Sequence, residues 1–435
     1  MRIAIITSGA AGMYCGSCMK DNTLASALGR QGHDALLIPT YTPIRTDEED
    51  HSQGRVFFGG INVYLEQKSW LFRHTPWFLD RLLNFPRLLR WVSRFAVKTQ
   101  ADQLGPLTVS MLQGKIGKQR KEIAKLVRYL KKEVHPDVIL LSNVLISGMV
   151  AELKSNLGVP VVGILQGDDI YLESLPPADR RQCIDLIRKN CEGLDGLIAT
   201  SAYYADFMAD YLGLSRDTIH VVHPGIRLKG HGEARMLREQ PPYTIGYFAR
   251  ICPEKGFHQL VEAFRILRQT PGVPDCRLRI SGWLGENNRS FFDAEMGKLR
   301  DAGLADAVEH VPSPDHAGKI AFLQSLDVLS VPTVYREPKG IYLLEALANG
   351  VPVVQPRHGS FPELIEATGG GLLVEPHDPT ALAEGMRKMI VDVAFRKECS
   401  ERGRASIRVQ FTDEHMATAT MAALNRIIRP STVPS

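Results

Sequence analysis

The chain has 435 residues, of which 44% are hydrophobic and 23% charged, and its basic and acidic side chains nearly balance at a net charge of +4. This composition is typical of a globular protein with a large buried core and excludes disorder as the main state, while the length allows two or three domains. The charge balance is too mild to indicate a protein that binds nucleic acid.

The seven cysteines, an odd number spread through the chain, argue against a disulfide framework. The N-terminal apolar run ends at a glycine after one basic residue, unlike the apolar core of a secretion signal. No stretch of the sequence reaches the length of a membrane span. The sequence therefore predicts a reduced, cytoplasmic protein.

Short β-branched segments alternate with amphipathic segments along the first half of the chain. Buried strands are predicted at Arg2–Thr7, Ala35–Pro39, Asp137–Leu141, Val159–Leu165, Leu197–Thr200 and His220–Val222. Helical patterns separate most of them, for example at Met19–Gln31, Ile146–Asn156 and Arg180–Cys191. Nearly continuous apolar strands that alternate with helices indicate a parallel sheet covered on both faces. We therefore predict a Rossmann-like α/β domain over residues 1–226.

A helical insertion at about 68–132 interrupts this alternation. Its first part, residues 68–98, carries seven Lys and Arg side chains against the single acid Asp80, and three of the protein's four tryptophans. A second basic helix is predicted at Lys115–Lys132. A basic segment rich in Trp, Phe and Leu can lie in a membrane interface, so peripheral contact with the inner membrane face is one interpretation. The other is a helical hairpin whose aromatic side chains pack on their own domain.

A loop that follows the first strand contains Gly12 and Gly16. Glycines let a backbone approach a ligand closely and the next helix offers free N–H groups, so we expect this loop to line a ligand cleft. Its spacing is not that of a dinucleotide site, and an oxidoreductase that uses this loop is kept only as an alternative. Cys15 and Cys18 have CxxC spacing, which fits a redox pair, half of a metal site or the packing of a tight loop; we favour packing.

The alternation stops at His223 and resumes at Tyr243. The polar stretch 227–242 is predicted to be a linker, followed by a second Rossmann-like domain over 243–410. A C-terminal helix over 411–435 is expected to pack toward the first domain. Strands of the second domain are predicted at Tyr243–Phe248, Cys276–Ser281, Val308–Val311, Asp327–Val331, Val351–Gln355 and Gly371–Val374. Its helices include Gly256–Leu267, Phe291–Ala302, His316–Leu323 and Ile341–Ala348.

Two cations stand at the first strand–loop–helix junction of the second domain. Arg250 and Lys255 flank the loop after the strand, and Gly256 opens the helix. Two cations at such a junction can flank a diphosphate, because the helix dipole adds to their attraction for an anion. Two solvated surface charges would give the same pattern.

A second motif runs from Glu337 to Glu345 and includes Lys339, Gly340, Ile341 and Tyr342. The N–H groups at the start of the predicted helix are free donors and form a natural phosphate seat. A carboxylate on an otherwise apolar helix is costly to bury unless it accepts hydrogen bonds, and ribose hydroxyls are suitable donors to Glu345. Glu337, at the mouth of the loop, can accept hydrogen bonds from sugar hydroxyls.

Together these motifs resemble glycosyltransferase family 4, the glycogen-synthase-like retaining glycosyltransferases. The resemblance is strong over residues 243–378 and weaker in the first half. It implies an α/β GT-B fold, in which two Rossmann-like, doubly wound parallel-sheet domains face each other across a cleft. It also implies that the second domain holds a nucleotide-diphosphate sugar, that the first holds the acceptor, and that transfer proceeds with retention and without a metal or other cofactor.

The resemblance also implies residue roles. Catalytic roles fall to three residues of the second domain, in which the two cations neutralise the leaving diphosphate: Arg250, Lys255 and Glu337. Donor-binding roles fall to Gly256, Gly282, Lys339, Gly340, Ile341, Tyr342 and Glu345. We expect the cleft or acceptor loop to include Gly12, Gly16, Gln166 and Asp168.

One departure from the family pattern concerns Gln166, which stands where many members carry a histidine. Asp168 and Asp169 follow it, but their spacing is not that of a metal-binding acidic motif, and no metal is expected. The acceptor is left open as a glycan, a lipid-linked molecule or a small molecule. Because the histidine is absent, a non-catalytic protein of the same fold that binds a nucleotide sugar or acts in regulation stays an alternative.

Overall fold

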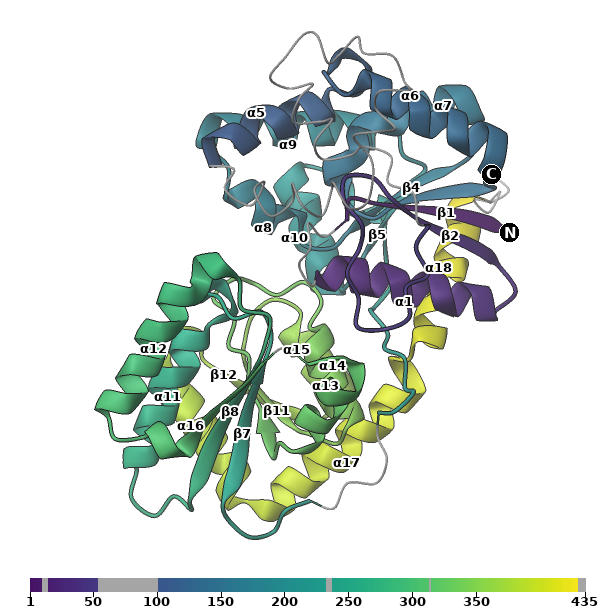
Figure 1. Cartoon of the computed structure of the whole chain (residues 1–435). Helices are drawn as coiled ribbons and strands as arrows, with labels where there is room; N and C mark the ends of the chain where they lie inside the picture. The colour runs from purple at the N-terminus through teal and green to yellow at the C-terminus, as the bar shows by residue number, and fades with distance from the viewer. Residues whose placement is uncertain (10–14, 54–100, 232–236, 313, 429–435) are drawn as a thin grey trace. The chain divides into compact units, whose positions relative to one another are not determined.

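The computed structural model of the chain describes residues 1–9, 15–53, 101–231, 237–312 and 314–428. They form two compact units (Figure 1). The first unit comprises Met1–His223 and the chain from Met416 onward, and the second comprises Pro224–His415. The described parts of the stretch predicted as a linker lie with the second unit, where His231 is buried.

The first unit is built on a six-stranded parallel sheet with the order β2-β1-β3-β4-β5-β6. Its strands are β1 (Arg2–Thr7), β2 (Asp34–Pro39), β3 (Val138–Leu141), β4 (Val161–Leu165), β5 (Gly196–Ala199) and β6 (Ile219–Val221). The predicted strands of the first half are confirmed to within two residues at each end. Successive strand residues point to opposite faces, and both faces are buried, as expected for a parallel sheet covered by helices.

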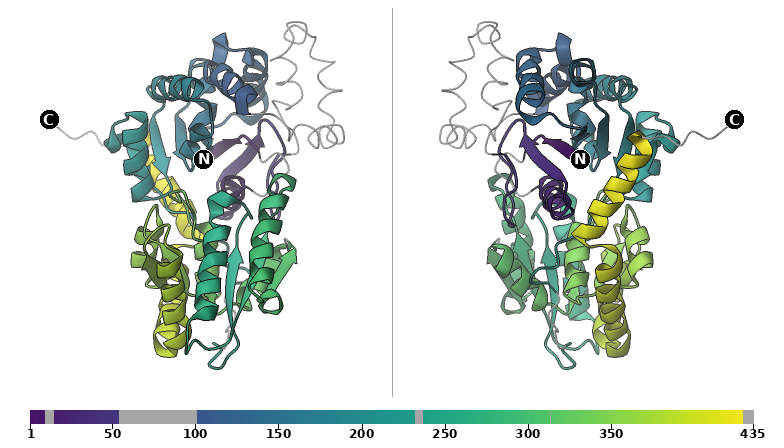
Figure 2. Two further views of the ribbon diagram at one scale, coloured as in Figure 1. Left: turned by 90° about the vertical axis from the view of Figure 1, so that its left-hand side faces the viewer. Right: turned by 90° about the vertical axis from the view of Figure 1, so that its right-hand side faces the viewer.

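Helices cover both faces of this first sheet. On one face Ile3 and Ile5 pack against α1 and α18, and on the other Ala4 and Ile6 pack against α6 and α7. The C-terminal helix α18 lies against β5, where Ile427 contacts Gly196 (Figure 2). The helices are α1 (Gly16–Arg30), α5 (Ala101–Leu112), α6 (Arg120–Tyr129), α7 (Val150–Leu157), α8 (Asp168–Glu173), α9 (Pro177–Cys191), α10 (Ala202–Leu212) and α18 (Asp413–Ile428).

One predicted helix of the first unit begins with a different type of helical turn. The segment predicted as a helix from Ile146 begins as a 3-10 turn, η4 (Val144–Met149), and becomes α-helical only at Val150. The reason is a close backbone approach, because a Cβ on Gly148 would lie 2.1 Å from the carbonyl oxygen of Met111. The tighter turn brings these two backbones into contact.

The predicted basic, aromatic segment 68–98 lies outside the described residues. The described part of the predicted insertion begins at α5 and continues through η2 (Gly114–Ile116) to α6. In the part of the chain that the structure describes, no helix combines the length and the apolar character needed to span a membrane.

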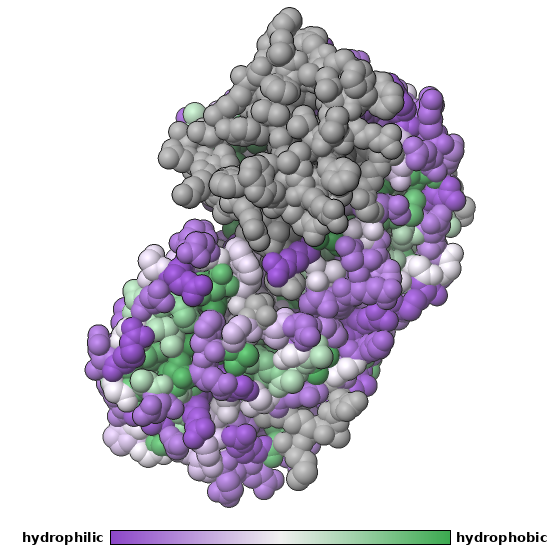
Figure 3. All heavy atoms as spheres, in the orientation of Figure 1, coloured by the Kyte–Doolittle hydropathy of each residue, from purple (hydrophilic) through white to green (hydrophobic). Residues whose placement is uncertain are grey.

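The second unit repeats the architecture with the strand order β12-β11-β10-β7-β8-β9. Its face visible in Figure 3 is mostly polar, because its helices turn their apolar sides toward the sheet. The strands are β7 (Tyr243–Phe248), β8 (Cys276–Gly282), β9 (Val308–Pro312), β10 (Val328–Leu329), β11 (Val353–Pro356) and β12 (Gly371–Val374). The helices are α11 (Phe257–Gln269), α12 (Arg289–Asp301), α13 (His316–Gln324), α14 (Ile341–Ala348), α15 (Phe361–Thr368), α16 (Pro379–Val391) and α17 (Val393–Gln410).

Candidate active site

The strand order of the second sheet fixes where a ligand is expected to bind. The first strand in sequence, β7, pairs with β8 on one side and with the later strand β10 on the other. Connections therefore leave in opposite directions at β7 and β10, and ligands of open α/β sheets bind at the carboxyl ends of strands beside such a switch point. The loop after β7 carries Arg250 and Lys255, and the loop after β10 carries Glu337.

The two loops touch each other directly. Gly256 ends the turn η6 (Pro253–Lys255) with a φ of 71°, and a Cβ there would lie 1.7 Å from the carbonyl oxygen of Pro332. Only glycine fits this approach, which brings Lys255 beside the second loop. The other two glycines that the sequence singled out, Gly282 and Gly340, also have positive φ values.

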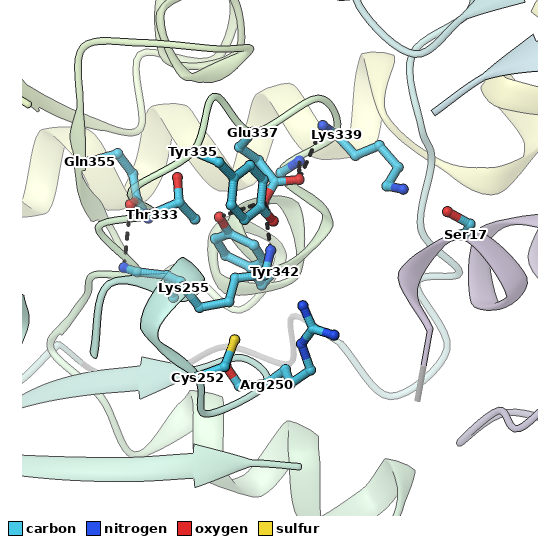
Figure 4. A network of polar contacts seen from close by, with 12 residues as sticks. Ser17, Arg250, Cys252, Lys255, Thr333, Tyr335, Glu337, Lys339, Tyr342 and Gln355 are labelled. Carbon is cyan, nitrogen blue, oxygen red and sulfur yellow. Dashed lines mark hydrogen bonds and ion pairs between the residues drawn. The ribbon is translucent and has the colours of Figure 1, made fainter. Parts of the chain in front are cut away.

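Glu337 is the centre of a hydrogen-bond network and is only 3% exposed. Its Oε2 accepts hydrogen bonds from Lys255 Nζ at 2.6 Å, Tyr335 Oη at 2.9 Å and Tyr342 Oη at 3.2 Å (Figure 4). Its Oε1 accepts longer bonds from the backbone N–H groups of Lys339 and Gly340, at 3.3 and 3.4 Å. Five donors therefore hold this carboxylate in place.

The network also sets protonation states. Burial alone would raise the pKa of Glu337, but the adjacent Lys255 ammonium and the hydrogen bonds lower that pKa to about 2. Burial and the nearby carboxylate raise the pKa of the Tyr335 and Tyr342 phenols well above its ordinary value. At neutral pH Glu337 is therefore ionised, and both tyrosines keep the protons that they donate to it.

The two predicted cations sit differently. Lys255 pairs with Glu337, and its ammonium lies 5.0 Å from the ring centre of Tyr335 and 4.9 Å from that of Tyr342. Arg250 is partly exposed and extends on the same side of the site as Lys255 and Tyr342 (Figure 4). Its guanidinium takes part in none of the ion pairs found among the described residues. Arg250 is thus the cation of this loop that can reach an anion without first breaking an internal pair.

Glu345 lies on α14, one turn beyond the phosphate seat predicted at the start of this helix, and is 7% exposed. Its Oε1 accepts a hydrogen bond from Lys319 Nζ of α13 at 2.7 Å. The donor that a buried carboxylate needs is thus supplied inside the protein, by a lysine that is itself 3% exposed. Sequence reasoning did not identify Lys319. The one signal for it was a lysine beside the buried Ile320 on a short helix.

At the switch point of the first sheet, between β1 and β3, the amide of Gln166 lies among buried carboxylates. Gln166 follows β4, is 2% exposed, and donates from Nε2 to the carbonyl oxygen of Ser142 at 2.5 Å. Asp168 accepts from the backbone N–H groups of Val144 and Gln166, both at 2.9 Å, and so joins the loops after β3 and β4. Asp169 accepts from Tyr204 Oη at 2.6 Å.

A residue that sequence reasoning missed completes this first network. Asp21, on α1, is fully buried and accepts hydrogen bonds from Ser142 Oγ and from Gln166 Nε2, the latter at 3.4 Å. Lys20 Nζ lies 3.3 Å from its carboxylate. Of the predicted loop glycines, Gly16 begins α1, and Gly12 lies outside the described residues.

Cysteine and acidic side chains are among the residues that could bind a metal ion in this protein. All seven cysteines lie within the described residues and are reduced. Cys15 caps the start of α1, and the buried Cys18 places its Sγ 3.8 Å from Thr7 Oγ1. No group of three or more His, Cys, Asp or Glu side chains that could hold a metal ion is found in the described part of the chain.

Two family models match the chain. The model for glycosyl transferases group 1 matches residues 234–406, which include the hydrogen-bond network around Glu337. The model for Glycosyltransferase Family 4 matches residues 105–229. The chain is a glycosyltransferase, and its first half matches the Family 4 model. The resemblance drawn from the motifs is thereby confirmed, and the activity of the protein is glycosyl transfer from a nucleotide sugar.

Relatives and solved structures agree with this assignment. The glycosyltransferase is 28% identical over 297 residues to D-inositol 3-phosphate glycosyltransferase of Paenarthrobacter aurescens, which covers 65% of this chain and 71% of that protein. Sucrose-phosphate synthase of Thermosynechococcus elongatus superposes with a TM-score of 0.72 and 18% identity, over 99% of this chain and 100% of that one. HepE of Anabaena, solved with UDP and glucose, superposes with a TM-score of 0.67 and 17% identity, over 98% and 100%. These likenesses confirm the two-domain GT-B fold.

Proposed function

We propose that this glycosyltransferase moves a sugar from a nucleotide-diphosphate sugar with retention of the anomeric configuration and without a metal ion or other cofactor. The observation that carries the proposal is the cationic switch point of the second unit. There Arg250, Lys255 and the first N–H groups of α14 surround the ends of β7 and β10. Because HepE was solved with UDP and glucose, UDP-glucose is the first donor to test.

In the proposed reaction, the bond between the anomeric carbon and the diphosphate breaks first and negative charge grows on the leaving group. Arg250 and Lys255 stabilise that charge, and the first N–H groups of α14, from Ile341 onward, add donors. Lys255 is already held beside the site by Glu337, so little reorganisation is needed. Glu337, ionised at neutral pH, is suited to accept hydrogen bonds from hydroxyls of the transferred sugar.

The acceptor hydroxyl then attacks from the face that the diphosphate leaves, and a diphosphate oxygen takes its proton. This front-face route needs no carboxylate as general base, which agrees with the internal bonding of Asp168 and Asp169. Gln166 contributes positioning rather than proton transfer. The test is the anomeric configuration of the first product formed from UDP-glucose, read by NMR. An inverted centre would overturn the mechanism.

The acceptor is proposed to bind at the first unit, near Gln166 and the loop that contains Gly12 and Gly16. If the segment 68–98 touches a membrane, the acceptor is lipid-linked, and vesicles with anionic lipid should bind the protein in a salt-sensitive way. Absence of binding at low salt would favour a soluble acceptor. We therefore propose peripheral association with the inner membrane face as salt-sensitive binding to anionic lipid.

A second candidate function rests on Gln166, which replaces the histidine of many family members. In that case the protein binds a nucleotide sugar without turnover and acts in regulation. A panel of UDP-, GDP- and ADP-sugars separates the two, because donor at 100 times its dissociation constant stabilises the fold by about 2.7 kcal/mol in both cases. Only the enzyme also releases the nucleoside diphosphate.

A further inference from the structure

A buried ion pair links helices α13 and α14 of the second unit. Lys319 Nζ lies 2.7 Å from Glu345 Oε1, and the two residues are 3% and 7% exposed. At the C-terminal cap of α14, Asn349 Nδ2 donates to the backbone carbonyl oxygen of Glu345 and lies 2.8 Å from His231 Nδ1. The position of Glu345 is therefore fixed through its side chain and through its backbone.

Stability does not explain this pair. Removing two charges from water costs several kcal/mol for each ion, and well-packed apolar residues in the same place are often as stable or more stable. The surroundings would suit such residues, because Leu343, Leu344, Ala346 and Leu347 on α14 and Ile320 and Leu323 on α13 are all buried in an apolar core. A costly pair in such surroundings indicates a task for the carboxylate.

The place of Glu345 on its helix suggests which task. Four residues separate Ile341, the first residue of α14, from Glu345, which is roughly 6 Å along a helix axis. A nucleotide with its diphosphate at the start of α14 carries its ribose one methylene group further away. The ribose hydroxyls then come near the second turn, where Glu345 lies. An ionised carboxylate offers about four acceptor sites, more than the bond to Lys319 alone uses.

We propose that Lys319 is a positioning residue that holds the Glu345 carboxylate, in one orientation, to accept hydrogen bonds from the ribose hydroxyls of the donor nucleotide. This inference rests on the proposed binding of a nucleotide-diphosphate sugar at the second unit. In this arrangement Lys319 touches the nucleotide only through Glu345. It gives the glycosyltransferase its preference for a ribonucleotide over one that lacks the ribose hydroxyls.

The test is a binding cycle that crosses a protein variant with a ligand variant. Calorimetry measures the affinity of the wild type and of Lys319→Met for UDP and for 2′,3′-dideoxy-UDP, and likewise for the GDP and ADP pairs. Charge-assisted hydrogen bonds of this kind correspond to an expected 10- to 100-fold preference of the wild type for the ribonucleotide. In Lys319→Met the preference should fall to about twofold, with the affinity for the dideoxy nucleotide nearly unchanged.

Lys298→Met is the matched control, because Lys298 makes an ion pair of the same 2.7 Å length with the buried Glu295 on α12. This control should keep the full ribose preference. Lys319→Arg, which keeps the charge, should restore at least part of the preference, and Glu345→Gln should lose it as Lys319→Met does. If Lys319→Met does not fold, Lys319→Arg and Glu345→Gln give the same readout.

The outcomes separate the two proposals. Binding of none of the three diphosphates by the wild type would overturn the proposed donor site itself. Tight binding with no preference for the ribonucleotide would overturn only the role of Glu345. An undiminished preference in Lys319→Met would overturn the positioning role of Lys319 and leave the pair as a structural feature.

Discussion

The two sheets of this glycosyltransferase end in polar networks of different electrostatic character. In the first unit, the amide of Gln166 and the carboxylate of Asp21 are bonded to each other and to Ser142, Lys20 pairs with Asp21, and Asp168 and Asp169 add two further carboxylates. In the second unit, Arg250 extends beside the Lys255–Glu337 pair and adds a second positive charge. The same architecture therefore provides a hydrogen-bonding edge rich in carboxylates in one unit and an edge that carries cations in the other.

This difference suits the proposed division of labour between the units. A diphosphate carries negative charge that increases as the sugar leaves, so it needs cations that are already in place. An acceptor hydroxyl is neutral, so it needs hydrogen bonds of the right geometry. Substitutions that remove charge should therefore act strongly in the second network, and substitutions in the first should act weakly.

The largest effect is expected from Arg250→Ala. Removing this guanidinium deletes charge-assisted hydrogen bonds worth roughly 1.5–3 kcal/mol each, so kcat/KM should fall by about 10- to 100-fold or more while the melting temperature hardly changes. Arg387→Ala, which removes a surface cation paired with Glu384 on α16, is the control and should keep full activity. Wild-type turnover in Arg250→Ala would contradict the assignment of the diphosphate site.

Lys255→Ala is expected to lower both turnover and stability. Its loss leaves the buried Glu337 carboxylate without its ammonium partner, and an unpaired buried charge costs about 3–5 kcal/mol. Activity should therefore be compared at a temperature where both proteins are folded, as checked by circular dichroism. This coupling is why Arg250→Ala, and not Lys255→Ala, is the cleaner test of the comparison between the two networks.

The second effect concerns stability against acid. The pKa of Glu337 is held at about 2 in the folded protein and returns to its ordinary value near 4.5 on unfolding. A pKa that is depressed by folding stabilises the protein above the unfolded value, and this contribution is lost as the pH falls from about 4.5 toward 2. The difference corresponds to roughly 3 kcal/mol. Thermal melts of the wild type and Glu337→Gln should differ most at pH 6 and converge only as the pH approaches 2, and a constant difference would contradict this account.

The sequence predicted the strands of both sheets closely because their apolar runs are set by local burial. It located the start of α1 less well, at Met19 instead of Gly16. The buried face of this helix carries Lys20, Asp21, Asn22 and Thr23, so hydrophobic periodicity is weak where the helix begins. These polar side chains are buried because they bond to loops from distant parts of the chain, which no local pattern reveals.

For the candidate site, too, the sequence indicated single residues but not the contacts between distant parts of the chain. Motifs indicated Lys255, Glu337 and Glu345 one by one, from glycines and charges at helix starts. The pairs they form were not predictable, because Lys255 and Glu337 lie 82 residues apart and Lys319 and Glu345 lie 26 apart. Only the neighbouring places of β7 and β10 in the sheet bring the first pair together.

A smaller effect is expected in the first network. Gln166→Ala should lower kcat by about tenfold, because it removes internal hydrogen bonds to Ser142 and Asp21 at the edge where the acceptor hydroxyl is proposed to bind. It should leave the pH–rate profile unchanged in shape, since an amide does not titrate. Gln166→Asn keeps the amide on a shorter side chain and serves as the comparison. A titration that appears or disappears in Gln166→Ala would mean that this residue acts on a proton transfer.

The smallest expected effect is that of removing divalent metal ions. If Arg250, Lys255 and the start of α14 supply the positive charge that the leaving diphosphate needs, a bound cation has no charge left to balance. Dialysis against EDTA should then change kcat by less than twofold, and adding back Mg²⁺ or Mn²⁺ should have no larger effect. The dependence of turnover on metal ions should differ in Arg250→Ala, because this variant lacks one of the cations that balance the diphosphate charge. Mg²⁺ bound to the diphosphate should partly restore turnover in that variant and not in the wild type, and a metal requirement in the wild type would refute the proposed charge balance.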